Sequence, residues 1–248
     1  MTTILGIDIG GTGIKGAPVD LEAGALAGER FRIPTPPGGS PDDVAKVVGE
    51  IVANFDTTGP IGCTFPAVMQ RGVALTAANV DQSWIGTDAQ ALFESVVPRP
   101  FVVINDADAA GIAEVEHGAG KGKSGTVMII TLGTGIGSAL FTDGVLVPNT
   151  EFGHLDIRGK PAEVRASEKA REGGDLSWEK WAKRLNEVLA HIEALLCPDL
   201  FIIGGGISKK SEKFLPLLKT RAEIVPAQLL NQAGIVGAAI GASRSVAP

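Results

Sequence analysis

GIDIGGTGIKG, at residues 6–16, says more about the architecture of this chain than any other segment. Apolar residues precede its glycines, and the residues after them alternate in the manner of a second strand rather than a helix. We therefore expect a β-hairpin whose tip is formed by Gly10, Gly11, Thr12 and Gly13. Backbone N–H groups at such a tip, with the Thr12 hydroxyl beside them, can hold an anion such as phosphate. A plainer interpretation, in which the glycines serve only to allow positive φ, stays open here.

Two charged residues flank this tip. Asp8 is expected at the end of the first strand, where its carboxylate could hold a hydrated Mg²⁺ beside bound phosphate. Lys15 lies two positions after Gly13, on the expected second strand. It either neutralises phosphate or points to solvent, and the alternating pattern does not choose between the two.

Two better-known phosphate loops fit less well. A dinucleotide fingerprint needs a helix after its glycines, whereas a strand is expected here. HGAGKGKS at residues 117–124 comes near the GxxxxGK[ST] loop, but His117 stands where the first glycine belongs. That segment also follows a predicted helix and precedes a predicted strand, which is the reverse of the required order. We interpret it as a helix-to-strand connection.

A weak internal repeat indicates that a later part of the chain has the same plan. TILGIDIGGTGIKGAPVD (residues 3–20) and MIITLGTGIGSALFTDG (residues 128–144) share one plan: an apolar strand, a glycine-rich tip and a returning strand. Helical patterns follow each copy, which predicts two similar α/β lobes facing each other across a crevice. We expect the first lobe over residues 1–105 and the second over 106–234. We expect a C-terminal helix at about 235–248 that packs back on the first lobe.

Composition narrows the function classes. The 248 residues carry a net charge of −6, which argues against a broad basic face for nucleic acid. No apolar run is long enough for a membrane span, and no secretion signal precedes the first strand. Cys63 and Cys197 are the only cysteines. We therefore expect a cytoplasmic protein that has neither a disulfide framework nor a cysteine zinc site.

Five motifs occur in one order along the chain. They are DIGGTGIKG at 8–16, IND with ADAAG at 104–111, LGTGIG at 132–137, EFGH at 151–154 and IIGGGIS at 202–208. Together they resemble the ROK family of sugar kinases, in the actin-like/hexokinase (ribonuclease H-like) superfamily. The resemblance implies a two-lobed α/β fold with a central cleft. The short chain and the segment CPDLFIIGGGISKK are similar to the polyphosphate glucokinase branch of that family.

The resemblance also implies a role for each matching position. Asp106 would be the base, and residues contacting the sugar would be Asn79, Asn105, Asp106, Glu151, His154 and Glu163. The first phosphate loop would run from Gly10 to Lys15, and a second would comprise Gly133, Thr134 and Gly135. Gly205 and Gly206 would line the nucleotide or distal-phosphate side. The implied metal is Mg²⁺, held by Asp8 through water, and a homodimer is expected by resemblance alone.

The chemistry of these residue types supports the roles, although each has a plainer alternative. Phosphoryl transfer to a hydroxyl needs a group that accepts the hydroxyl proton, and a carboxylate at a rigid strand end suits that task. Asp106 could instead cap the following helix. Glu151 and His154 follow an apolar strand in a glycine turn, where they could pair with sugar hydroxyls or form a solvated loop pair.

One departure from the family pattern concerns zinc. Typical members follow GH with a second histidine and a cysteine cluster that hold a structural zinc. EFGHLDIRGKPAEVRAS at 151–167 contains no cysteine, so no structural zinc is expected. Glu163, with Ala166 and Ser167, resembles the E..AS segment that follows the zinc loop elsewhere.

Basic residues gather in the same region. A run of five lies at Arg158, Lys160, Arg165, Lys169 and Arg171, and other lysines flank glycine loops at Lys121, Lys123, Lys209, Lys210 and Lys213. They form either a track for a phosphate polymer or an ordinary helix face paired with Glu163, Glu168 and Glu172.

The resemblance thus implies transfer of a phosphoryl group from polyphosphate, and also from ATP, to the 6-hydroxyl of glucose. Mannose is a plausible second acceptor. Three alternatives remain: a strictly ATP-dependent kinase for another hexose, a non-catalytic sugar sensor of the same family, and a polyphosphatase of the same superfamily. Neither a nucleic-acid nor a membrane partner is expected.

Overall fold

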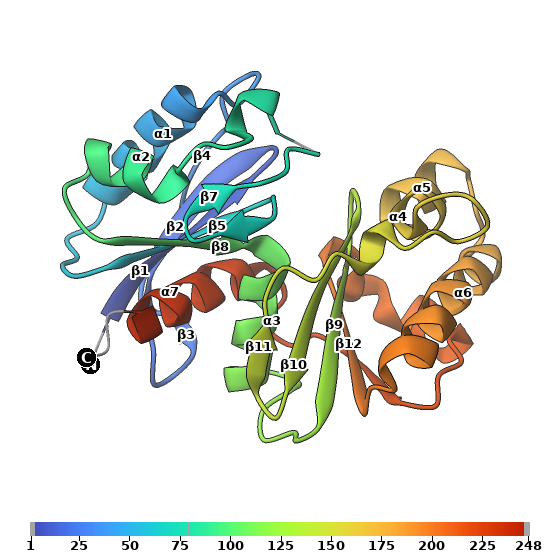
Figure 1. The fold of residues 1–248 in the computed structure, drawn as a ribbon. Coiled ribbons are helices and arrows are strands. Elements are labelled where there is room, and N and C mark those ends of the chain that lie inside the picture. Colours follow the sequence, from blue (N-terminus) through green and yellow to red (C-terminus); the bar gives the residue numbers. More distant parts are fainter. Residues whose placement is uncertain (1–2, 79, 246–248) are drawn as a thin grey trace. The chain divides into compact units, whose positions relative to one another are not determined.

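The predicted hairpin is present in the computed structural model, which describes residues 3–78 and 80–245 (Figure 1). Strands β1 (Thr3–Gly10) and β2 (Gly13–Asp20) pair antiparallel, with Gly10 opposite Gly13. The chain forms two compact units, which divide after Ala113 and before Gln232. We expected the first boundary after residue 105. It lies further along because α3 (Asp106–His117) begins in the first unit and ends in the second.

The first unit is built on a six-stranded sheet. Its main order is β3-β2-β1-β5-β8, and β4 also pairs with β2. The new strands are β3 (Ala25–Leu26), β4 (Phe31–Ile33), β5 (Ile61–Phe65) and β8 (Phe101–Asn105). Strands β1, β5 and β8 run parallel, so their carboxyl ends lie at the same edge of the sheet. Residues placed at these ends are therefore neighbours in space.

Helices cover both faces of this sheet. Helix α1 (Pro41–Ala53) begins at the Ser40 cap, whose hydroxyl accepts from Asp43 N–H. Helix α1 packs on the sheet at Gly16, where a Cβ would collide with the Ile51 side chain. Helix α7 (Ala233–Ser245) packs on the other face, since a Cβ at Gly6 would collide with the backbone of Ile235. The C-terminal helix therefore belongs to the first unit, on the face opposite α1 (Figure 1).

Short elements complete the first unit. They are β6 (Met69–Gln70), β7 (Val73–Ala74), the 3-10 turn η1 (Gln82–Trp84) and helix α2 (Ala89–Val96). Strand β7 ends at Ala74. There the main chain bonds to a neighbouring loop: Ala74 N–H donates to Thr87 C=O, and Gly86 N–H donates to Ala74 C=O.

The second unit contains the other copy of the repeat. Its five-stranded sheet has the order β11-β10-β9-β12-β13. The antiparallel strands are β9 (Thr126–Leu132), β10 (Ile136–Thr142) and β11 (Val145–Val147). Strands β12 (Leu200–Gly204) and β13 (Glu223–Pro226) run parallel to β9. The β9–β10 tip thus matches the β1–β2 tip in topology.

One long helix packs along the core of this unit. Helix α6 (Trp178–Leu196) begins at the Ser177 cap and buries Trp181, Leu185 and Leu189 against the sheet. Shorter elements are η2 (Phe152–His154), α4 (Ala162–Ala166), α5 (Glu168–Gly173), η3 (Gly206–Lys213), η4 (Leu215–Leu217) and η5 (Leu230–Gln232). Several of the predicted site residues lie in these short elements rather than on strands.

Candidate functional site

The first glycine tip is open in front and anchored behind. A side chain at Gly11 would meet nothing within 4 Å. Behind the tip, Thr35 donates its hydroxyl to Gly10 C=O at 2.5 Å, and Arg32 donates to Thr12 C=O at 2.6 Å. Neither Gly10, Gly11 nor Gly13 has a positive φ, so the interpretation that positive φ alone requires these glycines is wrong. Gly11 leaves open space in front of the tip, whereas a Cβ at Gly13 would collide with the Arg32 guanidinium.

Asp8 lies between two cross-strand neighbours. Lys15 is directly opposite on β2 and approaches Asp8 Oδ2 with its Nζ at 2.8 Å. Thr64, opposite on β5, donates its hydroxyl to Asp8 Oδ1 at 2.7 Å. The Lys15 side chain therefore pairs with the Asp8 carboxylate. It does not point freely into solvent, and it does not reach beyond Asp8.

The Asp8 carboxylate still suits a hydrated Mg²⁺. An ionised carboxylate accepts at about four lone-pair positions, and each Asp8 oxygen has one of the two partners described above. Lone pairs remain for water molecules of a metal ion whose other ligands are phosphate oxygens. Within the described ranges, no group of three or more His, Cys, Asp or Glu side chains could hold a metal ion directly. The absence of a structural zinc stays a prediction.

Asn105, the last residue of β8, and Asp106, the first residue of α3, have different surroundings. Asn105 is buried, and its Oδ1 accepts from the N–H groups of Ala107 and Asp108 at 2.8 and 3.1 Å. Its amide nitrogen donates to Ala67 C=O at 3.0 Å. Asn105 is thus the residue that caps α3, a task considered for Asp106 from the sequence. Asp106 is the first residue of the helix; its side chain is exposed, and its Oδ1 also accepts from Ala107 N–H, at 2.9 Å.

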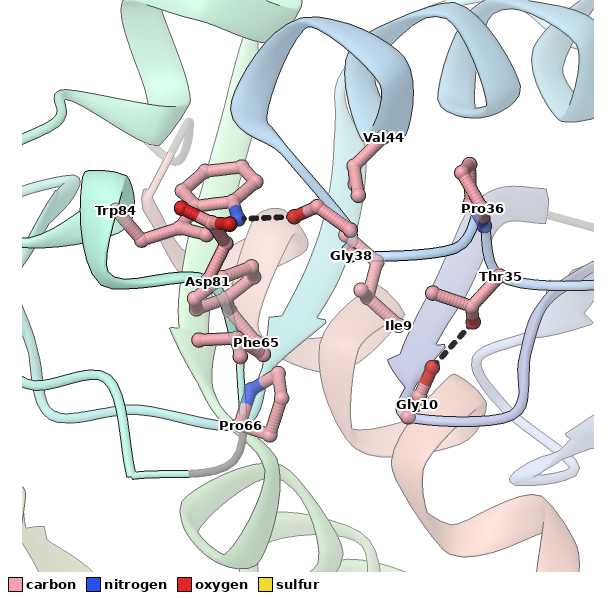
Figure 2. A pocket seen from close by; sticks show the side chains of 13 residues that line it. Ile9, Gly10, Thr35, Pro36, Gly38, Val44, Phe65, Pro66, Asp81 and Trp84 are labelled. Carbon is pink, nitrogen blue, oxygen red and sulfur yellow. Dashed lines mark hydrogen bonds between the residues drawn. The ribbon is translucent and has the colours of Figure 1, made fainter.

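A cavity of about 320 Å³ lies beside the first glycine tip (Figure 2). Figure 2 shows Phe65, Pro66 and Trp84 on one side, with Gly10 and Thr35 on the other. The Trp84 indole N–H donates to Gly39 C=O at 2.8 Å, which fixes the ring at the wall. Sequence reasoning missed this cavity, although a tryptophan among polar residues was a usable signal. Asn79 lies outside the described residues.

In the second unit, three segments meet at the β9–β10 tip. Lys169 N–H donates to Gly133 C=O at 3.1 Å, which ties the start of α5 to the tip. Gly205 has φ +86°, and a Cβ there would collide with the backbone of Leu132. Gly133, like Gly11, has open space where a side chain would lie, and Thr134 is exposed. Gly206 follows Gly205 and begins η3.

Glu151, His154 and Glu163 also come together in this unit. His154 Nδ1 lies 3.9 Å from Glu151 Oε2, and His154 Nε2 lies 3.7 Å from Glu163 Oε1. Glu163 Oε2 in turn accepts from Ile136 N–H at 3.4 Å, directly after the second tip. Burial raises the pKa of Glu151, the His154 charge lowers that pKa, and the Glu163 charge raises it further. Glu163 therefore connects this carboxylate–histidine cluster with the glycine tip.

The run of basic residues divides into two groups. Arg158 and Arg165 both bind Glu187 of α6, at 2.7 Å each, rather than the glutamates of their own segment. Arg171 pairs with Glu172 and stacks on Trp178, with its guanidinium carbon 4.4 Å from the ring centroid. These arginines already have partners. The exposed lysines of the region are Lys160, Lys169, Lys209, Lys210 and Lys213.

Comparison with known proteins places the chain in a family. The sequence profile of the ROK family matches residues 4–164. The chain belongs to the ROK family. It is 52% identical to a polyphosphate glucokinase of Mycobacterium tuberculosis over 236 residues, 95% of this chain and 89% of that protein. No helix among the described residues is long and apolar enough to cross a bilayer.

Two solved structures are also similar to this chain. The inorganic polyphosphate/ATP-glucomannokinase of Arthrobacter sp. strain KM is 53% identical, with a TM-score of 0.94 over 99% of this chain and 100% of that one. A ROK family glucokinase of Streptomyces griseus, solved with glucose and AMPPNP, is 26% identical, with a TM-score of 0.83 over 98% and 100% of the two chains. The two-lobed α/β fold of the hexokinase type is therefore confirmed.

Proposed function

We propose that this ROK family protein is a polyphosphate-dependent glucokinase that also accepts ATP as donor. The observation that carries the proposal is the 52% identity to a polyphosphate glucokinase across 95% of the chain. The similarity to a polyphosphate/ATP-glucomannokinase supports ATP as second donor and mannose as second acceptor. The phosphoryl group passes to the 6-hydroxyl of the sugar.

In this proposal Asp106 acts as the general base. The sugar 6-oxygen attacks the terminal phosphorus, its proton passes to the Asp106 carboxylate, and the donor leaves one phosphate shorter. Asp106 is exposed at the start of α3, and Asn105 accepts from two N–H groups of the first turn, so the cap does not depend on Asp106 alone. Glu151, His154 and Glu163 bind sugar hydroxyls, and Asn79 and Asn105 belong to the same set by resemblance.

The glycine tips and Asp8 serve the donor. Gly10 to Gly13 and Gly133 to Gly135 hold phosphate oxygens with backbone N–H groups, and Gly205 and Gly206 line the distal side. Asp8 would hold Mg²⁺ through water, and Lys15 balances the negative charge of the Asp8 carboxylate. Bound Mg²⁺ neutralises the charge that develops on the phosphate oxygens during transfer.

Two further properties complete the proposal. We infer a cytoplasmic enzyme, because Cys63 and Cys197 are both free, as in proteins of reducing compartments. We also infer a homodimer, by resemblance to the ROK family alone. Light scattering of the purified protein tests the oligomeric state: a dimer mass supports the inference, and a monomer mass at micromolar concentration contradicts it.

A matrix of donors and acceptors tests the activity. Purified protein is assayed with long-chain polyphosphate or ATP, against glucose, mannose or fructose, with Mg²⁺ or with excess chelator. We expect glucose 6-phosphate from both donors, the higher rate with polyphosphate, and no turnover with chelator. Activity with ATP alone would support the strictly ATP-dependent alternative. Phosphate release without sugar would support a polyphosphatase, and sugar binding without turnover would support a sensor.

A further inference from the structure

Thr64 is a fully buried residue near the end of β5 that motif reasoning left without a role. Its hydroxyl makes two hydrogen bonds. It donates to Asp8 Oδ1 at 2.7 Å, and it accepts from the N–H of Ile9 at 3.2 Å. Thr64 therefore contacts both the carboxylate that we propose for Mg²⁺ and the backbone immediately before Gly10.

The sheet register explains why these groups meet. Asp8 lies opposite Lys15 on one side and opposite Thr64 on the other, so three side chains form a row across β2, β1 and β5. Helix α7 closes the space beside this row: a Cβ at Gly234 would lie 3.0 Å from Asp8 Cγ. Helix α7 therefore bounds one side of the Asp8 carboxylate, and the rotational orientation of that carboxylate depends on Lys15 and Thr64.

Lys15 alone would not fix that orientation. The side-chain torsion that turns an aspartate carboxylate is broad, without sharp minima. Lys15 contacts one carboxylate oxygen, Oδ2, from a side chain that is 24% exposed. A carboxylate held at one oxygen by a flexible cation can still rotate. The buried hydroxyl of Thr64 holds the second oxygen and removes this rotation.

We propose that Thr64 is a positioning residue for phosphoryl transfer. Its hydroxyl orients Asp8 toward the metal–phosphate side and aligns the Ile9 backbone that leads into the first glycine tip. The proposal rests on the proposed function, because it assigns Asp8 to the hydrated Mg²⁺ of the donor. It predicts that Thr64 controls turnover and Mg²⁺ use rather than sugar affinity.

Two substitutions separate the hydroxyl from the packing of Thr64. Thr64→Val keeps the shape but removes the donor, and Thr64→Ser keeps the hydroxyl but removes a methyl group. A misplacement of about 1 Å can cost roughly 100-fold in rate, so we expect Thr64→Val to lower kcat ten- to a hundredfold. It should also raise the Mg²⁺ concentration for half-maximal rate, with the KM for glucose within about threefold of wild type. Thr64→Ser should restore both properties to within a few-fold.

Thr220→Val is the matched control, because it removes a hydroxyl that donates to Ala222 C=O in the other unit. A binding measurement accompanies the kinetics: the rise in melting temperature on adding tripolyphosphate with Mg²⁺, compared with tripolyphosphate and chelator. We expect the Mg²⁺-dependent part of that rise to shrink in Thr64→Val and to return in Thr64→Ser.

Several outcomes would overturn the positioning role. One is a Thr64→Val variant with wild-type kcat, Mg²⁺ dependence and thermal shift. Another is a Thr64→Ser variant with a large loss of kcat, which would show that the methyl packing matters instead. The serine variant decides the question even if the valine variant fails to fold. The failure of the proposed function itself looks different: wild type would then transfer no phosphoryl group, while the thermal shifts would still report on Thr64.

Discussion

The two units hold their candidate functional residues in different ways. In the first unit these residues lie at the carboxyl ends of neighbouring parallel strands. Gly10 is the last residue of β1, Asn105 is the last residue of β8, and Thr64 lies one residue before the end of β5. In the second unit Glu163 and Lys169 lie on short helices and reach the β9–β10 tip from 27 and more residues along the chain. A residue at a strand end is positioned by the backbone hydrogen bonds of the sheet. A residue on one of these short helices is positioned by individual side-chain and backbone contacts.

This difference predicts which substitutions change the reaction without changing the stability of the fold. Substitutions at strand ends in the first unit should change the reaction while the sheet stays intact. Substitutions in the loop-built cluster of the second unit should change binding and local structure together.

Asp106→Asn should show the largest effect, confined to turnover. Removing a positioned proton acceptor lowers rates by roughly 10²- to 10⁴-fold. Glucose binding and melting temperature should change little, because the amide still offers hydrogen bonds and Asn105 caps the helix. Steady-state kinetics and calorimetry measure the two properties, with Asp42→Asn on the exposed side of α1 as control. Near-normal turnover in a folded variant would exclude Asp106 as the base.

Glu163→Gln should affect two functions at once. The variant loses the charge beside His154 and weakens the contact to Ile136 N–H. A hydrogen bond to a charged group contributes about 1.5–3 kcal/mol, so kcat/KM for glucose should fall roughly ten- to a hundredfold. The donor KM should rise as well, because Glu163 also supports the second tip. The exposed Glu50→Gln is the control, and a loss restricted to either substrate would contradict the connecting role.

Replacing Lys169, Lys209 and Lys210 by alanine should weaken long polyphosphate selectively. Each exposed charge contact contributes about 0.2–1 kcal/mol, so the KM for long chains should rise roughly three- to a hundredfold. The KM for ATP should change less, and added salt should reduce the difference between variant and wild type. The matched control replaces Lys180, Lys183 and Lys219, which are exposed elsewhere in the same unit. Equal losses for ATP and polyphosphate would indicate a folding or sugar-site defect, and no loss for either would place the polymer elsewhere.

Glu151→Gln should have the smallest effect, visible in the pH dependence of stability. Burial raises the pKa of Glu151 above its ordinary value of 4.5, so the folded state favours the protonated acid. That contribution is present below pH 4.5 and is lost as pH rises through the raised pKa. The neutral variant should therefore melt slightly higher than wild type at pH 7, with the gap closing at acidic pH. A variant that melts lower at pH 7 would contradict the direction of the shift.

Local patterns allowed much of the first unit to be predicted. Apolar runs with glycine stops indicated the β1–β2 hairpin, and Ser40 with Pro41 indicated the start of α1. No local pattern indicated the end of β7, where Ala74 bonds to Thr87 and Gly86 in another loop. The reason for glycine at the first tip was also open, because sequence cannot distinguish free space from positive φ.

Side-chain partners were the least predictable feature. Lys15 and Asp8 both attracted attention from the sequence, yet their pairing follows from β-strand register. Arg158 and Arg165 were expected to meet phosphate or nearby glutamates, but they share Glu187, more than twenty residues away. No motif singles out Glu114, although it is buried and accepts from the N–H groups of Ala119, Gln228 and Leu229.

The amino-acid sequence by itself determined the repeated strand–tip–strand plan, the ROK family membership and the identity of the residues that carry charge and hydroxyl groups. These properties depend on residue type and on spacing over a few positions, where backbone geometry is regular. The tertiary structure alone decided that Thr64 and Lys15 hold Asp8, that Asn105 rather than Asp106 caps α3, and that Glu163 reaches Ile136. Each of these contacts joins atoms through strand register or packing, and a hydrogen bond of about 3 Å depends on where whole elements come to rest.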